Sequence, residues 1–231
     1  MKIKKLLNYF SLFEWLLWSF SMLAVILSYC LSGEMNILSL IASMVGVTAL
    51  IFIAKGNVIG QFLIILFAVI YAIISIQFRY WGEMITYLFM SLPASLFACI
   101  SWLKNPSKES KNEVAVASLT KKKVFFCFLL ALVATVIFYF ILKYFHTAQL
   151  VLSTLSITTS VLASSFLFLR NRFYALAYAA NDVVLIGLWV FAALKSPSSL
   201  PMVICFIAFL CNDLYGFFNW KRIEKKQNLI K

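Results

Sequence analysis

The chain has 231 residues, of which 64% are hydrophobic and only 12% are charged, with a formal net charge of +12. Soluble globular domains are nearer half apolar and a quarter charged, so this composition excludes an ordinary soluble domain and indicates an integral membrane protein. The apolar runs do not alternate with polar residues, which excludes a transmembrane barrel and favours helices. The basic residues lie between the apolar runs, so they indicate control of membrane topology and not binding of nucleic acid.

Eight apolar segments follow in chain order, each close to the roughly 20 residues that a helix needs to cross a bilayer. We predict transmembrane helices at residues 12–32, 36–54, 58–78, 83–103, 123–143, 148–169, 172–194 and 199–220. The first apolar run follows a short basic stretch but is too long for a signal peptide and lacks a small-residue cleavage site. We therefore expect it to be a retained helix.

The distribution of basic residues predicts the orientation. If the N-terminus is cytoplasmic and the chain crosses eight times, 17 of the 20 Lys and Arg residues fall on the cytoplasmic side. Arg79, Lys143 and Lys195 fall outside. Cytoplasmic loops carry such an excess of cations, so we predict a multi-pass protein of the cell (inner or plasma) membrane with both termini in the cytoplasm.

A polar stretch divides the apolar segments into two groups, and we interpret it as a flexible cytoplasmic connector rather than a binding motif. The predicted units are an N-terminal helix (1–35), a first three-helix bundle (36–103), the connector (104–122), a linking helix (123–147), a second three-helix bundle (148–220) and a cytoplasmic tail (221–231).

An internal repeat supports this division. The sequence PASLFACISWLK from Pro93 aligns with CNDLYGFFNWKR from Cys211, 118 positions later, and the same offset places Tyr71 against Trp189. Two three-helix bundles joined by one helix run in the same direction. The expected fold is therefore all-α, with parallel repeats in the three-plus-one-plus-three plan of SWEET-like transporters and an extra N-terminal helix.

Two Asn-Asp pairs lie inside the last two segments: Asn181 with Asp182, and Asn212 with Asp213. A carboxylate near mid-membrane costs about 2.5–3.5 kcal/mol on insertion scales, so such pairs predict a polar cavity that a solute can enter. Both pairs lie roughly 12–13 Å from the cytoplasmic edge. A structural clamp between helices is the alternative. Adjacent Asn and Asp point about 100° apart, so both cannot face one cavity fully.

Aromatic residues accompany the amides. Trp189 follows Asn181 by eight residues and Tyr215 follows Asn212 by three, which places each on nearly the same helix face as its amide. A stacked ring with amides at its polar edges suits a flat heteroaromatic solute. The predicted substrate contacts are therefore these residues together with the two carboxylates.

The first bundle offers fewer polar groups. We expect Tyr71 and Gln61, the latter an amide well inside the third segment, to face the same site. Tyr80 and Glu83 mark the predicted outer mouth of the fourth segment.

Catalytic motifs are missing from the sequence. His146 is the single histidine, the five cysteines form no CxxC pair, and we find no HExxH, Walker loop or GxSxG. We expect no catalytic residue, metal or cofactor. An intramembrane enzyme with Asp182 and Asp213 as acid and base is an alternative of another class, and a structural subunit without a substrate is a third.

Several stretches resemble one family in order and spacing. The first bundle contains AKGN at 54–57, Tyr71, YWGEM at 80–84, Tyr87, LP at 92–93 and Trp102. The second contains LSITTSVLASSFLFLRNRFYALAYAANDVVLIGLW and closes with CNDLYGFFNWKR. Over about residues 36–226 the chain resembles the PnuC family, the nicotinamide riboside (historically nicotinamide mononucleotide) transporters.

This resemblance implies a homotrimer with the SWEET-like fold and no enzymatic activity. It implies facilitated diffusion, by alternating access, of a nucleoside-like B-vitamin precursor that a cytoplasmic kinase then traps. By position, Asn181, Trp189 and Asn212 match the family's polar and aromatic positions. Asp182 and Asp213 replace apolar or small residues of many nicotinamide riboside carriers. Related members carry thiamine or riboflavin, and a carboxylate favours a cation such as thiamine or the pyridinium of nicotinamide riboside, so all three substrates remain open, with nicotinamide riboside first.

Overall fold

The computed structural model describes residues 9–31, 37–77, 81–108, 110–147, 149–195 and 200–229, with the backbone alone at 75, 77 and 81–83. Within these ranges the regular structure is helical. The helices are α2 (Leu12–Leu31), α3 (Ile37–Ala54), α4 (Ile59–Gln77), α5 (Trp81–Thr86), the π-helical turn η1 (Tyr87–Ser91), α6 (Leu92–Lys104), α7 (Lys121–Tyr144), α8 (Leu150–Phe168), α9 (Phe173–Ala193) and α10 (Leu200–Leu229).

Seven helices in the described residues are long and apolar enough to cross a membrane. One of them, Met84–Lys104, is built from parts of α5, η1 and α6, and α4 adds a shorter apolar helix over Ile59–Ile74. Each predicted apolar segment therefore corresponds to helical structure in the described chain. The helix α10 continues about nine residues beyond Trp220, the end predicted for the last apolar segment.

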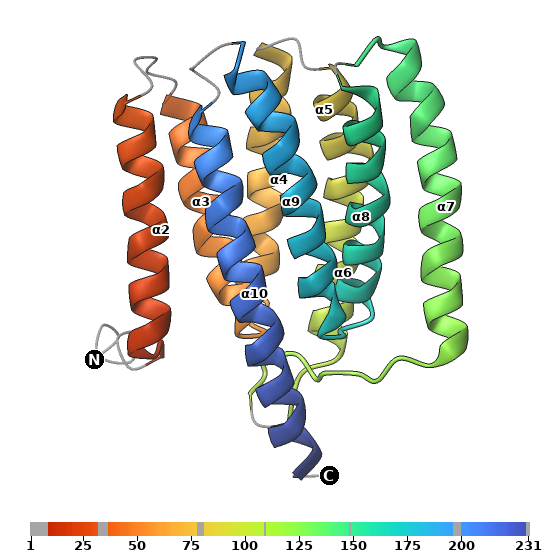
Figure 1. Ribbon diagram of the computed structural model, residues 1–231. Coiled ribbons are helices and arrows are strands. Elements are labelled where there is room, and N and C mark those ends of the chain that lie inside the picture. Colours follow the sequence, from red (N-terminus) through yellow and green to blue (C-terminus); the bar gives the residue numbers. More distant parts are fainter. Residues whose placement is uncertain are drawn as a thin grey trace.

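The helices stand side by side in one layered bundle, with α2 at one edge and α7 at the other (Figure 1). α10 packs against α9, α3 and α2, while α8 packs against α9, α7 and α6. α2 begins, α7 begins and α10 ends at the same end of the bundle, which we call the terminal end (Figure 1). The centre of the bundle is thus bounded by α3, α4, α6, α8, α9 and α10.

The helix from Trp81 to Lys104 is interrupted at η1. Pro93 follows this π-helical turn and lies in the first turn of α6. Proline has no N–H and its ring clashes with the carbonyl four residues earlier, so the helix cannot keep regular hydrogen bonds there. The widened turn changes which side chains face inward, a distortion often found at functional sites.

The connector between α6 and α7 is fixed to the bundle by hydrogen bonds, so the expected flexible linker was wrong. The Val114 amide donates to the Gly56 carbonyl at 2.9 Å, and the Ala117 amide donates to the Arg170 carbonyl at 2.9 Å. The side chain of Gln227, on the extended part of α10, accepts from the Val116 amide at 2.9 Å. The connector therefore ties the loops α3–α4 and α8–α9 to the end of α10.

Candidate functional site

An enclosed cavity of about 100 Å³ lies in the centre of the bundle, between α3, α4, η1, α6, α8, α9 and α10. Its wall on α9 and α10 carries Tyr174, Tyr178, Asn181, Asp182 and Asp213. Asn181 is the ninth residue of α9, about 12 Å from the start of that helix. The side chains of Asn181, Asp182 and Asp213 therefore lie together in the wall of one mainly apolar cavity.

Three hydroxyl groups on α8 hold the side chain of Asn181. Its Oδ1 accepts from Ser156 Oγ at 3.2 Å, Thr159 Oγ1 at 2.8 Å and Ser160 Oγ at 3.1 Å. The three donors are three and four residues apart, so they share one face of α8. With Oδ1 engaged and Asn181 only 6% exposed, its amide N–H groups are the part of the side chain that a bound molecule can use.

The carboxyl groups of Asp182 and Asp213 lie within hydrogen-bonding reach of each other. Both are buried, with 3% and 4% of their surface exposed. A hydrogen bond between two carboxyl groups needs a proton on one of them. No Lys or Arg lies among the described residues that line the cavity. The ionisable groups of this lining are therefore the two carboxyl groups and the tyrosine hydroxyls.

Two polar atoms in the cavity wall have no hydrogen-bond partner among the described residues. They are Oδ2 of Asp182 and the hydroxyl of Tyr174. A buried polar group left unpaired costs about 1–3 kcal/mol, so a fold that keeps two of them beside one cavity has atoms for a ligand to satisfy. The nearby Tyr178 hydroxyl is instead paired with Ser164 Oγ at 3.0 Å.

Asn212 lies away from the cavity. Its Nδ2 donates to Ser21 Oγ of α2 at 3.2 Å and to the Ala208 carbonyl at 2.8 Å. The structure does not bring Asn212 and Asn181 together in one lining, because Asp213, one residue further on, takes the inward face of α10. This is the 100° separation between neighbours on a helix.

Tyr215 also points elsewhere. Its hydroxyl donates to Glu14 Oε1 at 2.7 Å, and Glu14 forms an ion pair with Lys55 Nζ at 3.0 Å. Glu14 is only 2% exposed, so its carboxylate depends on these partners and not on water. Ser11 and Glu14 cap the start of α2 reciprocally, with the Ser11 amide bonded to Oε2 and the Glu14 amide bonded to Ser11 Oγ. These residues join α2 to α10 and to the loop α3–α4.

Three further predicted contacts do not line the cavity. Trp189 and Tyr71 are buried in an apolar cluster with Phe67 and Leu185. Tyr71 stacks at 4.2 Å against the ring of Tyr87, which does line the cavity, so Tyr71 supports the wall from behind. Gln61 is fully buried, and neither amide atom has a partner within the described residues.

The predicted mouth cannot be placed. Tyr80 lies outside the described residues, and the structure describes only the backbone of Glu83, in α5.

We did not predict from the sequence that hydroxyl groups on one face of α8 take part in the site. Ser160 and Ser164 line the main cavity, and Ser153, Ser156 and Ser160 line a smaller adjoining space of about 30 Å³. Both spaces share Asn181 in their walls. The signal was present as eight Ser and Thr residues between positions 153 and 165. It was overlooked because hydroxyls in apolar helices commonly bond their own backbone.

The cavity wall is built from pairs of positions at two constant separations. Five pairs are 114 residues apart: Leu50 with Ser164, Ile53 with Leu167, Ile64 with Tyr178, Phe67 with Asn181 and Ala68 with Asp182. Two pairs are 118 apart: Ser91 with Phe209 and Ser95 with Asp213. In the five pairs that are 114 residues apart, the earlier residue is always apolar, so the amide of Asn181 and the carboxyl group of Asp182 have no polar counterpart in the first half of the chain.

The loops α3–α4 and α8–α9 also match each other. Gly56 and Arg170 both adopt positive φ, at 67° and 57°. The next residues, Asn57 and Asn171, each accept a bond at Oδ1 from the amide two residues later, at 2.9 and 3.1 Å. The Gly56 and Arg170 carbonyls both accept hydrogen bonds from backbone amides of the connector. Equivalent loops at 114 residues of separation extend the pairing in the cavity wall.

Long apolar helices that surround a central cavity with a few polar groups in its wall are typical of an integral membrane protein. The family model described as nicotinamide mononucleotide transporter matches residues 36–222 of the chain. The chain belongs to this family of membrane transporters, which also classifies it as a carrier and not an enzyme.

Two relatives carry the name nicotinamide riboside transporter PnuC. The one from Neisseria mucosa is 24% identical over 195 residues, covering 83% of this chain and 74% of its own. The one from Haemophilus influenzae is 26% identical over 192 residues, covering 83% of this chain and 82% of its own. A solved structure described as the vitamin B3 transporter PnuC superposes with a TM-score of 0.81 at 22% identity, covering 94% of both chains. That likeness establishes a shared fold.

Proposed function

We propose that the chain carries nicotinamide riboside across the cell membrane and that the central cavity is its binding site. The observation that carries this proposal is the cluster of Asn181, Asp182 and Asp213 in one enclosed wall. The N–H groups of Asn181 suit the carbonyl oxygen of a carboxamide or a ribose hydroxyl. The carboxyl pair suits a positive pyridinium ring. The relatives named as nicotinamide riboside transporters support the same substrate.

The charge of the wall supports a choice between related solutes. A carboxyl pair without a basic neighbour in the described lining attracts a cation and repels a phosphate. Nicotinamide riboside is a cation, whereas its mononucleotide adds a negative phosphate. Thiamine is also a cation and is the second candidate, while riboflavin is neutral and gains nothing from the pair.

The architecture proposed for transport is two parallel three-helix units that enclose the site. One unit is α3, α4 and the interrupted helix α5–η1–α6, and the other is α8, α9 and α10, with α7 as the linking helix and α2 as an addition. The paired lining positions and the matched loops support this assignment. A site at the boundary of two repeats is the arrangement in which rocking of one unit against the other exposes it alternately to each side.

The size of the cavity supports such a motion. Sites for small organic molecules usually have volumes of roughly 300–1,000 Å³, and the space here is about 100 Å³. The walls must therefore separate before a nucleoside fits. On the terminal side the cavity is closed by Tyr174. The centroid of its ring lies 4.8 Å from that of Trp220, and the ring centroids of Trp220 and Trp102 are 5.4 Å apart. We assign this aromatic floor as one gate.

Facilitated diffusion, a homotrimer and a cytoplasmic kinase that consumes the product complete the proposal and rest on family resemblance. We place the terminal end in the cytoplasm, since the exposed Lys121, Lys122 and Lys123 lie there. The units at residues 1–35, 36–103, 104–122, 123–147, 148–220 and 221–231 are kept as proposed divisions.

Uptake into proteoliposomes containing the purified chain tests the substrate. We expect saturable, gradient-driven uptake of nicotinamide riboside without an added energy source. Uptake of thiamine should be weaker, and uptake of nicotinamide mononucleotide or riboflavin should be small. Dihydronicotinamide riboside, which has nearly the same shape but no positive charge, is the matched control and should be carried poorly. Equal uptake of the charged and neutral forms would contradict the role given to the carboxyl pair.

A further inference from the structure

α7 is the most exposed of the long helices. Only 11% of its apolar span is buried inside the bundle. It packs mainly on α8, where Thr135 Oγ1 and Thr158 Oγ1 are 2.7 Å apart. On the side facing η1 and α6 it leaves a groove of about 550 Å³. This groove is more than five times the volume of the central cavity.

The groove has an apolar lining and one basic end. Phe126, Leu130 and Ala134 of α7 form one wall, Pro93 and Phe97 face them, and Lys123 lies at the terminal end. The hydroxyls of Ser164 and Ser165 also reach the lining, but both are engaged, with Tyr178 and with the Val161 carbonyl. The interior of the groove therefore suits hydrocarbon.

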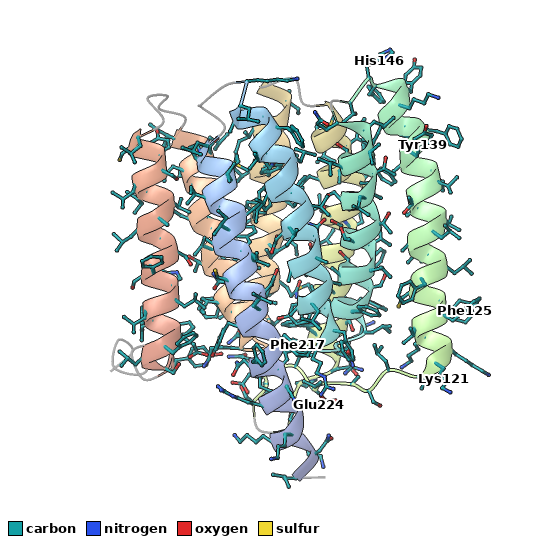
Figure 2. All side chains as sticks on the ribbon, in the orientation of Figure 1. Lys121, Phe125, Tyr139, His146, Phe217 and Glu224 are labelled. Carbon is teal, nitrogen blue, oxygen red and sulfur yellow. The ribbon has the colours of Figure 1, made fainter. Side chains whose placement is uncertain are left out.

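The basic end is larger than one residue. Lys121, Lys122 and Lys123 are all exposed in the first turn of α7. The ion pairs formed within the described residues are Lys55–Glu14 and Arg172–Glu224, so neither neutralises this turn. Figure 2 shows Lys121 at the terminal end of α7, with the ring of Phe125 just above it pointing away from the bundle. Cations next to lipid-facing aromatic rings are typical of the surface of a bilayer.

The length of the groove matches one leaflet. From Lys123 to Ala134 the helix rises about 16 Å, and half of a hydrocarbon core of about 30 Å is nearly the same. We propose that this groove binds an anionic phospholipid of the leaflet at the terminal end. Its headgroup contacts Lys123 at the end of the groove, Lys121 and Lys122 of the same turn add positive charge nearby, and one acyl chain lies between α7 and α6. Because Ser164 lines both the groove and the central cavity, the bound lipid lies directly behind the α8 wall of the substrate site.

Thermal unfolding of the full-length chain in mild detergent tests this site, with phosphatidylglycerol or phosphatidylcholine of the same acyl chains added. Phosphatidylglycerol should raise Tm about 2–4 °C more than phosphatidylcholine. The triple variant K121Q/K122Q/K123Q should lose that difference. The control K111Q/K221Q/K225Q removes the same charge from other exposed lysines and should keep it.

A second pair of variants tests the groove itself, with native mass spectrometry to count bound lipids and copies of the chain. Ala134→Phe fills the groove and should remove the retained phosphatidylglycerol, while Val133→Phe, on an exposed position of the same helix, should not. Retention of the lipid by Ala134→Phe would show that it binds the lysines outside the groove, and would overturn the proposal. Equal increases in Tm with phosphatidylglycerol and phosphatidylcholine would also overturn the proposal. So would a change in the oligomeric state of Ala134→Phe without loss of lipid.

Discussion

Trp102 and Trp220 lie against each other at the terminal end of the bundle, with ring centroids 5.4 Å apart. Trp102 Nε1 donates to the Leu167 carbonyl of α8 at 3.1 Å, and Trp220 Nε1 donates to the Ile53 carbonyl of α3 at 2.9 Å. Trp102 of α6 is thus bonded to α8 and Trp220 of α10 is bonded to α3, so each indole links the two proposed three-helix sets. Any rocking between the sets must break these bonds or turn about them.

The first prediction concerns these two indoles. Trp102→Phe and Trp220→Phe each remove one N–H donor from a carbonyl that keeps a backbone partner, the Arg170 or the Gly56 amide, so each should cost about the 0.5–1.5 kcal/mol of one hydrogen bond. We expect similar decreases in Tm for both variants, measured by thermal unfolding in detergent. Trp18→Phe is the control, since Trp18 is partly exposed on α2 and bonds to Thr48, and its decrease should be smaller. Unequal effects of the two core variants would contradict a reciprocal role.

The second prediction separates the two asparagines. Asn181→Ala removes the amide from the cavity wall, and loss of a hydrogen bond to a charged or polar solute should weaken binding about 10-fold or more. Asn212→Ala removes a bond to Ser21 of α2, so it should lower Tm and leave affinity nearly unchanged. Titration calorimetry with nicotinamide riboside and thermal unfolding measure the two effects. Loss of binding in both variants would restore Asn212 to the site.

The third prediction concerns the carboxyl pair. The double variant Asp182→Asn/Asp213→Asn keeps the shape of both side chains and removes the charge of the pair, which a single change would leave on the remaining carboxyl group. The double variant should lower the affinity for nicotinamide riboside about 10–100-fold, because an interaction with a charged group contributes more than a neutral one. Affinity for dihydronicotinamide riboside should change little. A parallel loss for the charged and neutral solutes would indicate that the pair only braces α9 against α10.

The fourth prediction concerns the attachment of α2. Lys55→Met leaves the buried Glu14 without its cation, which should destabilise the chain by about 3–5 kcal/mol. The double variant Glu14→Gln/Lys55→Met removes both charges and should recover much of this loss. The readout is thermal unfolding together with protease accessibility of the first helix. If the double variant were no more stable than Lys55→Met, the ion pair would not be what fixes α2.

The helices were predictable from the sequence because each apolar run must satisfy its backbone hydrogen bonds internally within a membrane. Two features were not. α10 extends past Trp220, and Gln227 in this extension bonds the connector, a tertiary contact that no local pattern reports. The interruption at η1 was predictable only as a kink at Pro93, since the sequence does not indicate a π-helical turn before it.

The site was predictable in part. Burial of amides and carboxyls in apolar helices pointed to Asn181, Asp182 and Asp213, which do line one cavity. Helical spacing could not decide which of Asn212 and Asp213 faces inward, since that depends on how α2 and α9 pack around α10. The offset of the internal repeat was also predicted only in part from the sequence. An offset of 118 aligns Tyr71 with Trp189, whereas the loops and the cavity residues of α3 and α4 are related to those of α8 and α9 by 114, which places Leu185 opposite Tyr71.

An experimental structure of the chain with nicotinamide riboside bound tests the central claim most directly. We predict the pyridinium ring beside Asp182 and Asp213, an amide contact to Asn181, and a cavity enlarged by separation of the two three-helix units. A ligand bound between α2 and α10 beside Asn212, with the central cavity still closed, would contradict the account.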